Sequence, residues 1–150
     1  MKRKKLIYAK SAGQKTKFKV GKFTKVLDKE FSLLIRSKGY CEKCGIEDNL
    51  QCCHIIPRTN KTLRWDILNA ISMCMRCHIW WSHKNPLDFT DWFKRKFPGR
   101  YDYLMENRNK IVKRTEEDYN EILENILSRN IRGLIVFPID NENTNRYTDN

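Results

Sequence analysis

CEKCGIEDNLQCCHIIPRTNKTLRWDILNAISMCMRCH, residues 41–78, is the stretch that decides the fold of this chain. It contains two Cys-x-x-Cys pairs, Cys41/Cys44 and Cys74/Cys77, which together can close a tetrahedral four-thiolate zinc site. The 29 residues between the pairs exceed the roughly 15–20 of common zinc pairs, and a β-hairpin would fill the gap. Because all four ligand positions are then taken, the sequence predicts a structural Zn²⁺. A redox pair or free thiols are the alternatives.

The composition favours one domain in a reducing compartment. The chain has 150 residues, 40% of them hydrophobic, which suits a single domain with a modest core. The chain has no run of about 18 apolar residues, so no membrane span is expected. No apolar signal segment follows the basic start, so a secretory signal is not expected. The six cysteines are then expected to stay reduced in the cytoplasm, which favours metal binding over disulfides. Cys52 and Cys53, which lie outside the pairs, are expected to be buried strand residues.

Positive charge gathers at the N-terminus. Residues 1–27 contain ten Lys and Arg and no acidic residue, so they carry almost all of the formal net charge of +12. We expect residues 1–23 to form a basic flexible arm that binds DNA phosphates, since each phosphate contact releases counterions. Its first contacts would come from Lys2, Arg3, Lys4 and Lys5. The alternative is a solubilising tail without a binding role.

Hydrophobic periodicity predicts an α+β protein with helices on both sides of the zinc stretch. Residues 24–86 are expected to form a helix followed by the zinc-stabilised core. Within this unit the pattern predicts a helix at 24–38, strands at 50–56 and 69–73, and a short helix from Cys74 to about residue 85.

Residues 87–139 are expected to form a helical C-terminal extension. Its predicted elements are helices at about 88–97, 101–113 and 116–130 and an edge strand at 134–139. Thr115 and Asp118 form a candidate capping box for the last of these helices. The polar residues 140–150 are expected to be disordered.

Three polar residues lie around the cysteine pairs at positions that suit phosphodiester hydrolysis. His54 ends the first predicted strand, Asn69 precedes Cys74 by five residues, and His78 follows Cys77 directly. Such hydrolysis needs a base that activates water and a metal ion that stabilises charge on the leaving oxygen. A histidine has the near-neutral pKa of a base and is also a common metal ligand.

The joint pattern resembles that of the HNH endonucleases, which have a ββα-metal fold. His54-Ile55-Ile56-Pro57 looks like the family's H-I-x-P, and the segment from Asn69 to His78 looks like its N-x-x-x-x-C-x-x-C-H. The resemblance implies that His54 is the general base, that Asn69 orients the ring or the loop of His54, and that His78 holds a catalytic divalent ion. The implied ion is Mg²⁺ or Mn²⁺, with Zn²⁺ or Ni²⁺ as alternatives, and the implied products carry 5′-phosphate and 3′-hydroxyl ends.

Residues 24–130 are also similar to the NinG (Rap) recombination endonuclease family of phage lambda. The similarity lies in FSLLIR at 31–36, in the first cysteine pair, in LRWDILN at 63–69 and, more diffusely, in the helical tail. It implies cleavage of branched DNA intermediates in a phage-infected bacterium. That pattern has Asn at the position of His78, and many HNH enzymes have a metal-binding Asp or His where this chain has Cys53. Because a thiolate suits Mg²⁺ poorly, either the ion is softer or Cys53 is not a ligand.

Further side chains are candidates for supporting roles. His83 is a candidate second ligand of the divalent ion, although it follows His78 by five residues and not by the four that align side chains on an α-helix. Arg58, Arg64 and Arg76 either contact DNA phosphates or form a solvated face. The four tryptophans are expected in the core, unless one is exposed and stacks on an unpaired base.

The sequence leaves three functions open. The first is a metal-dependent DNA endonuclease acting on branched or recombination DNA, for which a homodimer would cut a four-way junction symmetrically. The second is a homing or packaging type of HNH nicking nuclease. The third is a non-catalytic, zinc-stabilised module that binds nucleic acid. Binding alone does not need His54, Asn69 and His78, so this set separates the enzymes from the binding module.

Overall fold

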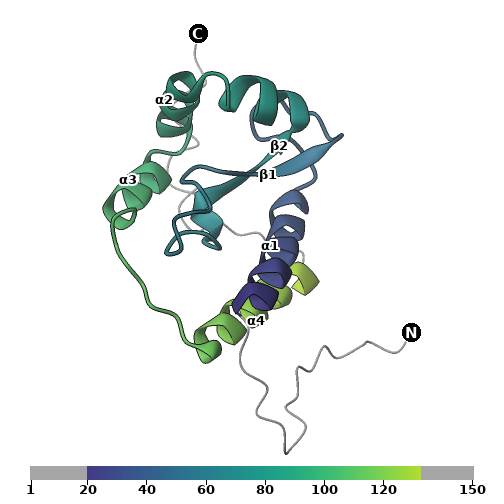
Figure 1. Ribbon diagram of the computed structural model, residues 1–150. Helices are drawn as coiled ribbons and strands as arrows, with labels where there is room; N and C mark the ends of the chain where they lie inside the picture. The colour runs from purple at the N-terminus through teal and green to yellow at the C-terminus, as the bar shows by residue number, and fades with distance from the viewer. Residues whose placement is uncertain (1–19, 133–150) are drawn as a thin grey trace, which may run out of the picture.

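The computed structural model describes residues 20–132 (Figure 1). This part of the chain is an α+β structure in which a two-stranded antiparallel sheet lies between helices. Its elements in chain order are α1 (Val20–Arg36), β1 (Leu50–His54), η1 (Ile67–Asn69), β2 (Ala70–Cys74), η2 (Arg76–Ser82), α2 (Pro86–Lys96), α3 (Pro98–Asn107) and α4 (Glu116–Arg132). Outside the described residues lie the predicted edge strand at 134–139, the segment 140–150, and the candidate DNA contacts Lys2, Arg3, Lys4 and Lys5.

Helix α1 is amphipathic and begins earlier than predicted. Its buried residues recur at the spacing of one helical face: Leu27, Phe31, Leu34 and Ile35. The helix starts at Val20, so residues 20–23 belong to it and not to the predicted arm. A tertiary contact explains this difference, because the ring of Phe23 lies 6.3 Å from that of Tyr119 in α4. The hydrophobic pattern of residues 20–36 alone could not predict this contact with Tyr119.

The predicted hairpin is present between the two cysteine pairs. Strand β1 pairs with β2, with Leu50 opposite Cys74 and His54 opposite Ala70. Side chains alternate between the two faces of such a sheet. Helix α1 packs on one face, while η2 and α2 lie on the other (Figure 1). Every residue of β2 is buried, so the hairpin is the centre of the described structure.

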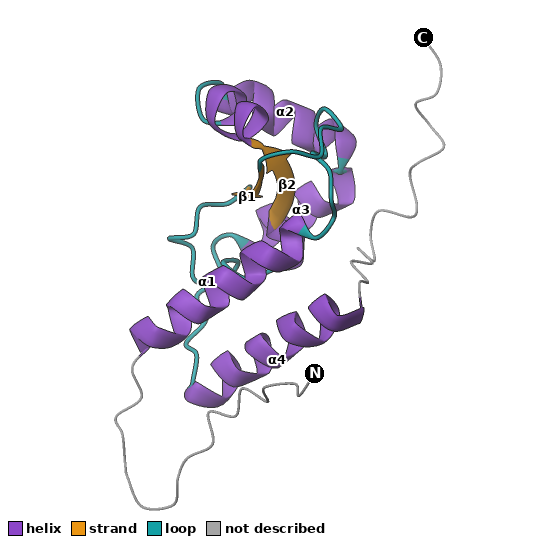
Figure 2. Cartoon of the chain, turned by 90° about the vertical axis from the view of Figure 1, so that its right-hand side faces the viewer, coloured by secondary structure: helices purple, strands orange, loops and turns teal. Residues whose placement is uncertain are grey.

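Two hydrophobic clusters hold this arrangement together. The first surrounds Ile71 and Met73 and includes Phe89 and Phe93 of α2. The second joins the buried face of α1 to Tyr119, Leu123 and Ile126 of α4, together with Trp65 and Ala70. Figure 2 shows the resulting pairing of α1 with α4, beside the hairpin. Helices that are far apart in the sequence therefore enclose the hairpin from opposite sides.

The short helix predicted after Cys74 is present, but it is not an α-helix. Element η2 is a π-helix, and the backbone N–H of His83 donates to the carbonyl of His78 at 3.2 Å. A π-helix closes its hydrogen bonds between residues five apart, and short π segments are frequent at functional sites.

The helices after η2 differ from their predicted bounds. Helix α2 starts at Pro86, two residues early, and α3 starts at Pro98 and ends at Asn107, so the predicted helix at 101–113 is misplaced. Proline suits the first turn of a helix because the N–H it lacks would have no partner there. Among residues 20–132, none of the helices is both long and apolar enough to cross a membrane.

The capping box predicted for α4 is confirmed. The Thr115 hydroxyl accepts the N–H of Asp118 at 3.3 Å, and the Asp118 carboxylate accepts the N–H of Thr115 at 2.6 Å. Just before it, the Arg114 guanidinium donates to the carbonyl oxygens of Thr62, at 2.9 Å, and Lys61. The segment between α3 and α4 is thereby tied to the loop that joins β1 to η1.

Candidate functional site

The four paired cysteines meet where β1 begins and β2 ends. One sulfur from each of Cys41, Cys44, Cys74 and Cys77 lies within 4.8 Å of the others, and the sulfurs of Cys44 and Cys74 are 3.7 Å apart. A tetrahedral zinc with Zn–S bonds of about 2.3 Å holds its sulfurs about 3.8 Å apart. The cluster therefore fits a four-thiolate ion. With all its positions filled, such an ion stabilises the fold by joining the turn after α1 to β2 and η2.

The backbone around the first pair is shaped for thiolates. Gly45 has φ +79°, which favours glycine, and its N–H donates to the carbonyl of Cys41 at 2.8 Å. Burial raises the pKa of the Cys41 thiol, but backbone N–H groups of Cys74, Cys44 and Lys43 outweigh burial and lower this pKa to about 7. A large share of Cys41 is thus in the metal-binding thiolate form at neutral pH.

His54 is held by the loop that follows it. Its Nε2 lies 2.9 Å from the carbonyl oxygen of Arg64, and its ring centroid lies 5.6 Å from that of Phe31. Because a carbonyl oxygen only accepts, Nε2 carries the proton and Nδ1 is the basic nitrogen. Burial lowers the pKa of His54, and the hydrogen bond to Arg64 opposes this effect only in part. The imidazole is therefore neutral at pH 7 and can take up a proton.

Asn69 fixes the two ends of that loop, and its side-chain hydrogen bonds go to the loop backbone and not to the His54 ring. Its Oδ1 accepts the N–H of Ile56 at 2.7 Å, and its Nδ2 donates to the carbonyls of Ile56 and Leu63, both at 3.0 Å. The side chain is fully buried. It thereby sets the path of the segment that carries the Arg64 carbonyl, and hence the orientation of His54.

His78 of η2 and His83, the C-cap of this helix, form a pair. Their ring centroids are 4.6 Å apart, because the i to i+5 turn of a π-helix brings residues five apart onto one face. Nδ1 of His78 lies 2.7 Å from Oε1 of Gln51 in β1, so it carries the proton and directs Nε2 away from the strand. Burial and the nearby His83 and His54 lower the pKa of His78 to about 4. His78 can therefore present a neutral Nε2 to a metal ion.

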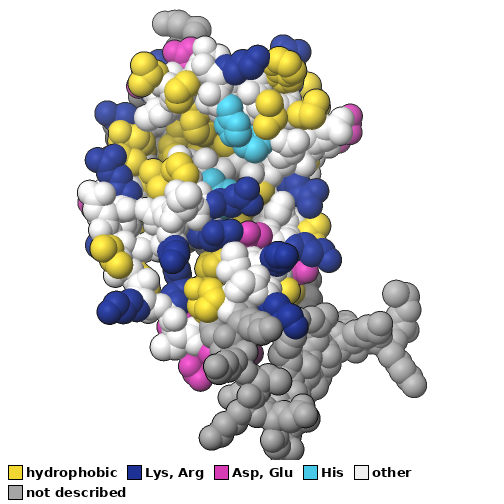
Figure 3. Space-filling view, in the orientation of Figure 1, with side chains coloured by type: hydrophobic (Ala, Val, Ile, Leu, Met, Phe, Trp, Pro, Cys, Tyr) yellow, Lys and Arg dark blue, Asp and Glu magenta, His cyan; other side chains and the backbone are white. Residues whose placement is uncertain are grey.

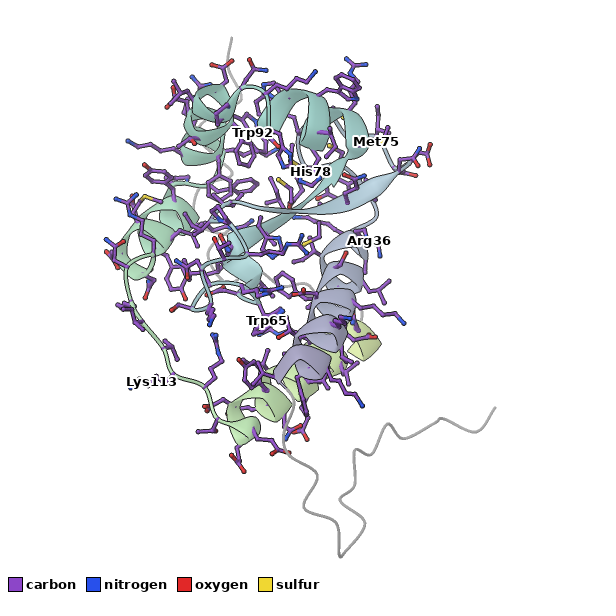
Figure 4. All side chains as sticks on the ribbon, in the orientation of Figure 1. Arg36, Trp65, Met75, His78, Trp92 and Lys113 are labelled. Carbon is purple, nitrogen blue, oxygen red and sulfur yellow. The ribbon has the colours of Figure 1, made fainter. Side chains whose placement is uncertain are left out.

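The histidines occur together on one face of the molecule. Figure 3 shows their side chains at the middle of this face, with Lys and Arg side chains beside them. In Figure 4, His78 lies between η2 and the hairpin. The arrangement brings a neutral base, two candidate metal ligands and positive charge to one surface, which is the set that phosphodiester hydrolysis requires.

Cys53 does not join this set. It is 1% exposed, and its sulfur lies 3.9 Å from the Ser82 hydroxyl inside the first cluster. Burial raises the pKa of Cys53 to about 12. The thiol is therefore protonated and turned into the core, as expected for a buried strand residue. Cys52 is only partly buried, and burial raises its pKa to about 12 as well.

The three candidate arginines have different environments. Arg58 and Arg76 are exposed, and the charge of Arg58 reaches both His54 and His78. Arg64 is engaged, because its guanidinium donates to both carboxylate oxygens of Asp28, at 2.9 and 2.6 Å. Its main contribution here is to anchor the loop that orients His54.

Besides Gln51, sequence reasoning missed two residues that support the site. Asp28 of α1 accepts from Arg64 and also from the indole N–H of Trp65, at 2.9 Å. Arg100 of α3 is fully buried and donates to the carbonyls on either side of Asn69, reaching Leu68 at 3.0 Å and Ala70 at 2.8 Å. Neither has a sequence signal, since an acid in one helix and an arginine in another are ordinary surface residues until the fold is known.

Within residues 20–132, the four cysteines are the one group of three or more Cys, His, Asp or Glu placed to hold a metal ion. Comparison with protein-family models, with curated proteins and with solved structures gives no significant match.

Proposed function

We propose that this chain is a metal-dependent DNA endonuclease of the HNH type. The observation that carries the proposal is the position of His54. His54 lies on the hairpin that the four cysteines flank, and its ring is hydrogen-bonded to the carbonyl of Arg64. The imidazoles of His78 and His83 lie close together at the helix that packs against that hairpin. The order of these residues also resembles the HNH pattern described above.

In the proposed reaction, His54 accepts the proton of the attacking water at Nδ1 and holds its own Nε2 proton on Arg64. Asn69 keeps the loop in place, and Gln51 orients His78. Nε2 of His78 and a ring nitrogen of His83 would hold the divalent ion, which when bound neutralises charge on the 3′ oxygen. Imidazole donors without a carboxylate favour Ni²⁺ or Zn²⁺ over Mg²⁺.

The proposed substrate is DNA, and the finer proposal is branched or recombination DNA. The basic residues near the site and the excess charge of residues 1–27 support a polyanion. The branched class rests on the resemblance to the NinG family, as do a phage origin and a bacterial cytoplasm. A four-way junction would require two copies of the chain to cut both strands symmetrically.

Nicking of a supercoiled plasmid tests the proposal. Wild type, His54→Ala and Leu87→Ala are each incubated with Mg²⁺, Mn²⁺, Ni²⁺ or Zn²⁺. Leu87 is 81% exposed and serves as the control. We expect His54→Ala to lose nicking by about a hundredfold or more, with zinc content and DNA binding retained. Wild type without activity under every ion, or His54→Ala as active as wild type, would refute the endonuclease.

A non-catalytic zinc module that binds nucleic acid is the second candidate. It is favoured by the finding that, among the described residues, only the four cysteines form a complete metal-binding group. This candidate predicts tight DNA binding without nicking by any ion.

Linear duplex, forked and four-way DNA distinguish the remaining endonuclease classes, since equal cleavage of all three contradicts the branched-DNA proposal.

A further inference from the structure

The π-helix η2 has an exposed ridge beside the histidine pair. Trp80 is 57% exposed, although a tryptophan normally buries most of its large apolar ring. Arg76 precedes it by four residues and Lys84 follows it by four, and both are exposed. The Lys84 ammonium lies 4.0 Å from the centroid of the Trp80 ring. The ridge is thus one aromatic side chain between two cations.

Trp80 differs from the other three tryptophans. Trp65 is buried and donates its indole N–H to Asp28. Trp81 and Trp92 pack edge to face with each other, with centroids 5.5 Å apart, and both contact Phe89. These three rings are held by the fold, whereas Trp80 leaves much of its ring open to solvent. Among the described residues, its ring contacts only Lys84 by a cation–π interaction.

The ridge lies on the same helix as the candidate metal ligands. His78 lies in η2 and His83 is its C-cap, while Arg76 and Trp80 are exposed residues of η2 and the exposed Lys84 follows His83 directly. A DNA strand whose phosphate meets the histidine pair would therefore pass over this ridge. Figure 3 shows hydrophobic and basic side chains next to the histidines at the upper part of that face.

The chemistry of the ridge selects one kind of ligand. Two cations attract a phosphate backbone, and an open indole stacks on a base. In an intact duplex the base faces are already stacked, so only an unpaired nucleotide offers one. We propose that Trp80 is a stacking site for an unpaired nucleotide next to the scissile phosphate. The inference rests on the proposed endonuclease function, and it names flapped, gapped or branched DNA as the preferred substrate class.

Cleavage measures the selectivity. A flap substrate and an intact duplex of the same sequence are cut by wild type, Trp80→Ala, Trp80→Phe and the control Leu87→Ala. We expect Trp80→Ala to lower the ratio of flap to duplex cleavage by about tenfold, the scale of one stacked base. Trp80→Phe should recover most of that ratio, because it retains an aromatic face. An unchanged ratio of flap to duplex cleavage in Trp80→Ala would overturn the proposal. The ridge would then be better explained as a surface that contacts another protein.

Binding provides a second measurement that does not need catalysis. In the His54→Ala background, a short oligothymidine should quench part of the tryptophan fluorescence, and Trp80→Phe should remove that quenching. Quenching that survives Trp80→Phe would also overturn the stacking site. If wild type cuts no DNA but the Trp80-dependent quenching is present, the endonuclease fails while the stacking site stands.

Discussion

The rings of His78 and His83 are 4.6 Å apart because a single π-helical turn separates the two residues. An α-helix would align His78 with residue 82, which is a serine, and would turn His83 partly away. On an α-helix, a spacing of five residues would argue against His83 as a second ligand beside His78. On a π-helix, the same spacing brings the two side chains close together.

We expect His83→Ala to raise the ion concentration needed for half-maximal nicking by roughly 10–100-fold, because one of two imidazole donors is lost. His83→Asn, which keeps a side-chain donor, should lie between the alanine variant and wild type. Titration of nicking with Mn²⁺ measures this. An unchanged midpoint in His83→Ala would exclude His83 as a ligand.

The pH dependence of cleavage should report His54. Burial lowers its pKa from 6.5, and the neutral form is the base, so the single-turnover rate should be level above about pH 7. As pH falls through the lowered pKa, the ring becomes protonated and the rate should decrease. His78, with a pKa of about 4, remains neutral over that range. A rate that rises on acidification would contradict His54 as the base.

The rate of cysteine alkylation should depend on whether zinc is bound. Burial raises the pKa of Cys52 and Cys53 to about 12, so at about pH 8 only some 1 in 10,000 of each is thiolate. With zinc bound, iodoacetamide should therefore label none of the six cysteines quickly. After chelation, labelling should appear at Cys41, whose pKa is lowered to about 7, as located by peptide mass spectrometry. Rapid labelling of a paired cysteine in zinc-loaded protein would contradict the four-thiolate site.

Asp28→Asn should destabilise the fold at neutral pH. Burial alone would raise the pKa of Asp28, but hydrogen bonds from Arg64 and Trp65 outweigh it and lower this pKa below 3.8. The stabilisation is therefore fully present above that value and is lost as pH falls through the lowered pKa. Urea unfolding at pH 7 should show a loss of about 1–2 kcal/mol.

At about pH 3 the difference between Asp28→Asn and wild type should be smaller, because Asp28 of the unfolded wild-type chain is then largely protonated and part of the stabilisation is lost. Asp102→Asn, which replaces an exposed aspartate of α3, is the control and should match wild type at both pH values. A constant difference between Asp28→Asn and wild type would show that charge is not the source of the stabilisation.

Removal of residues 1–19 tests the basic arm without truncating α1, which begins at Val20. The deletion takes away eight Lys and Arg. We expect weaker DNA binding and a shallower dependence of log affinity on log salt concentration, because fewer counterions are released. Fluorescence anisotropy over a range of salt concentrations measures the slope. A slope equal to that of the full chain would show that residues 1–19 do not contribute to DNA binding.

Local pattern determined much of this protein. The Cys-x-x-Cys pairs, the hairpin between them, the apolar face of α1 and the capping box of α4 were all predicted, because each depends on neighbours along the chain. Helix bounds were predicted less well. Residues 20–23 belong to α1, where Phe23 contacts Tyr119 of α4, and Pro98 starts α3 where the pattern placed a break.

The candidate site was decided by tertiary contacts. The sequence named His54, Asn69 and His78, but not what holds them. The Arg64 carbonyl, Asp28 of α1, Gln51 of β1 and Arg100 of α3 orient them across the fold. The sequence also left open whether Cys53 is a metal ligand and what pitch η2 has. Both depend on packing against residues far away in the chain, which a one-dimensional pattern of residue types does not contain.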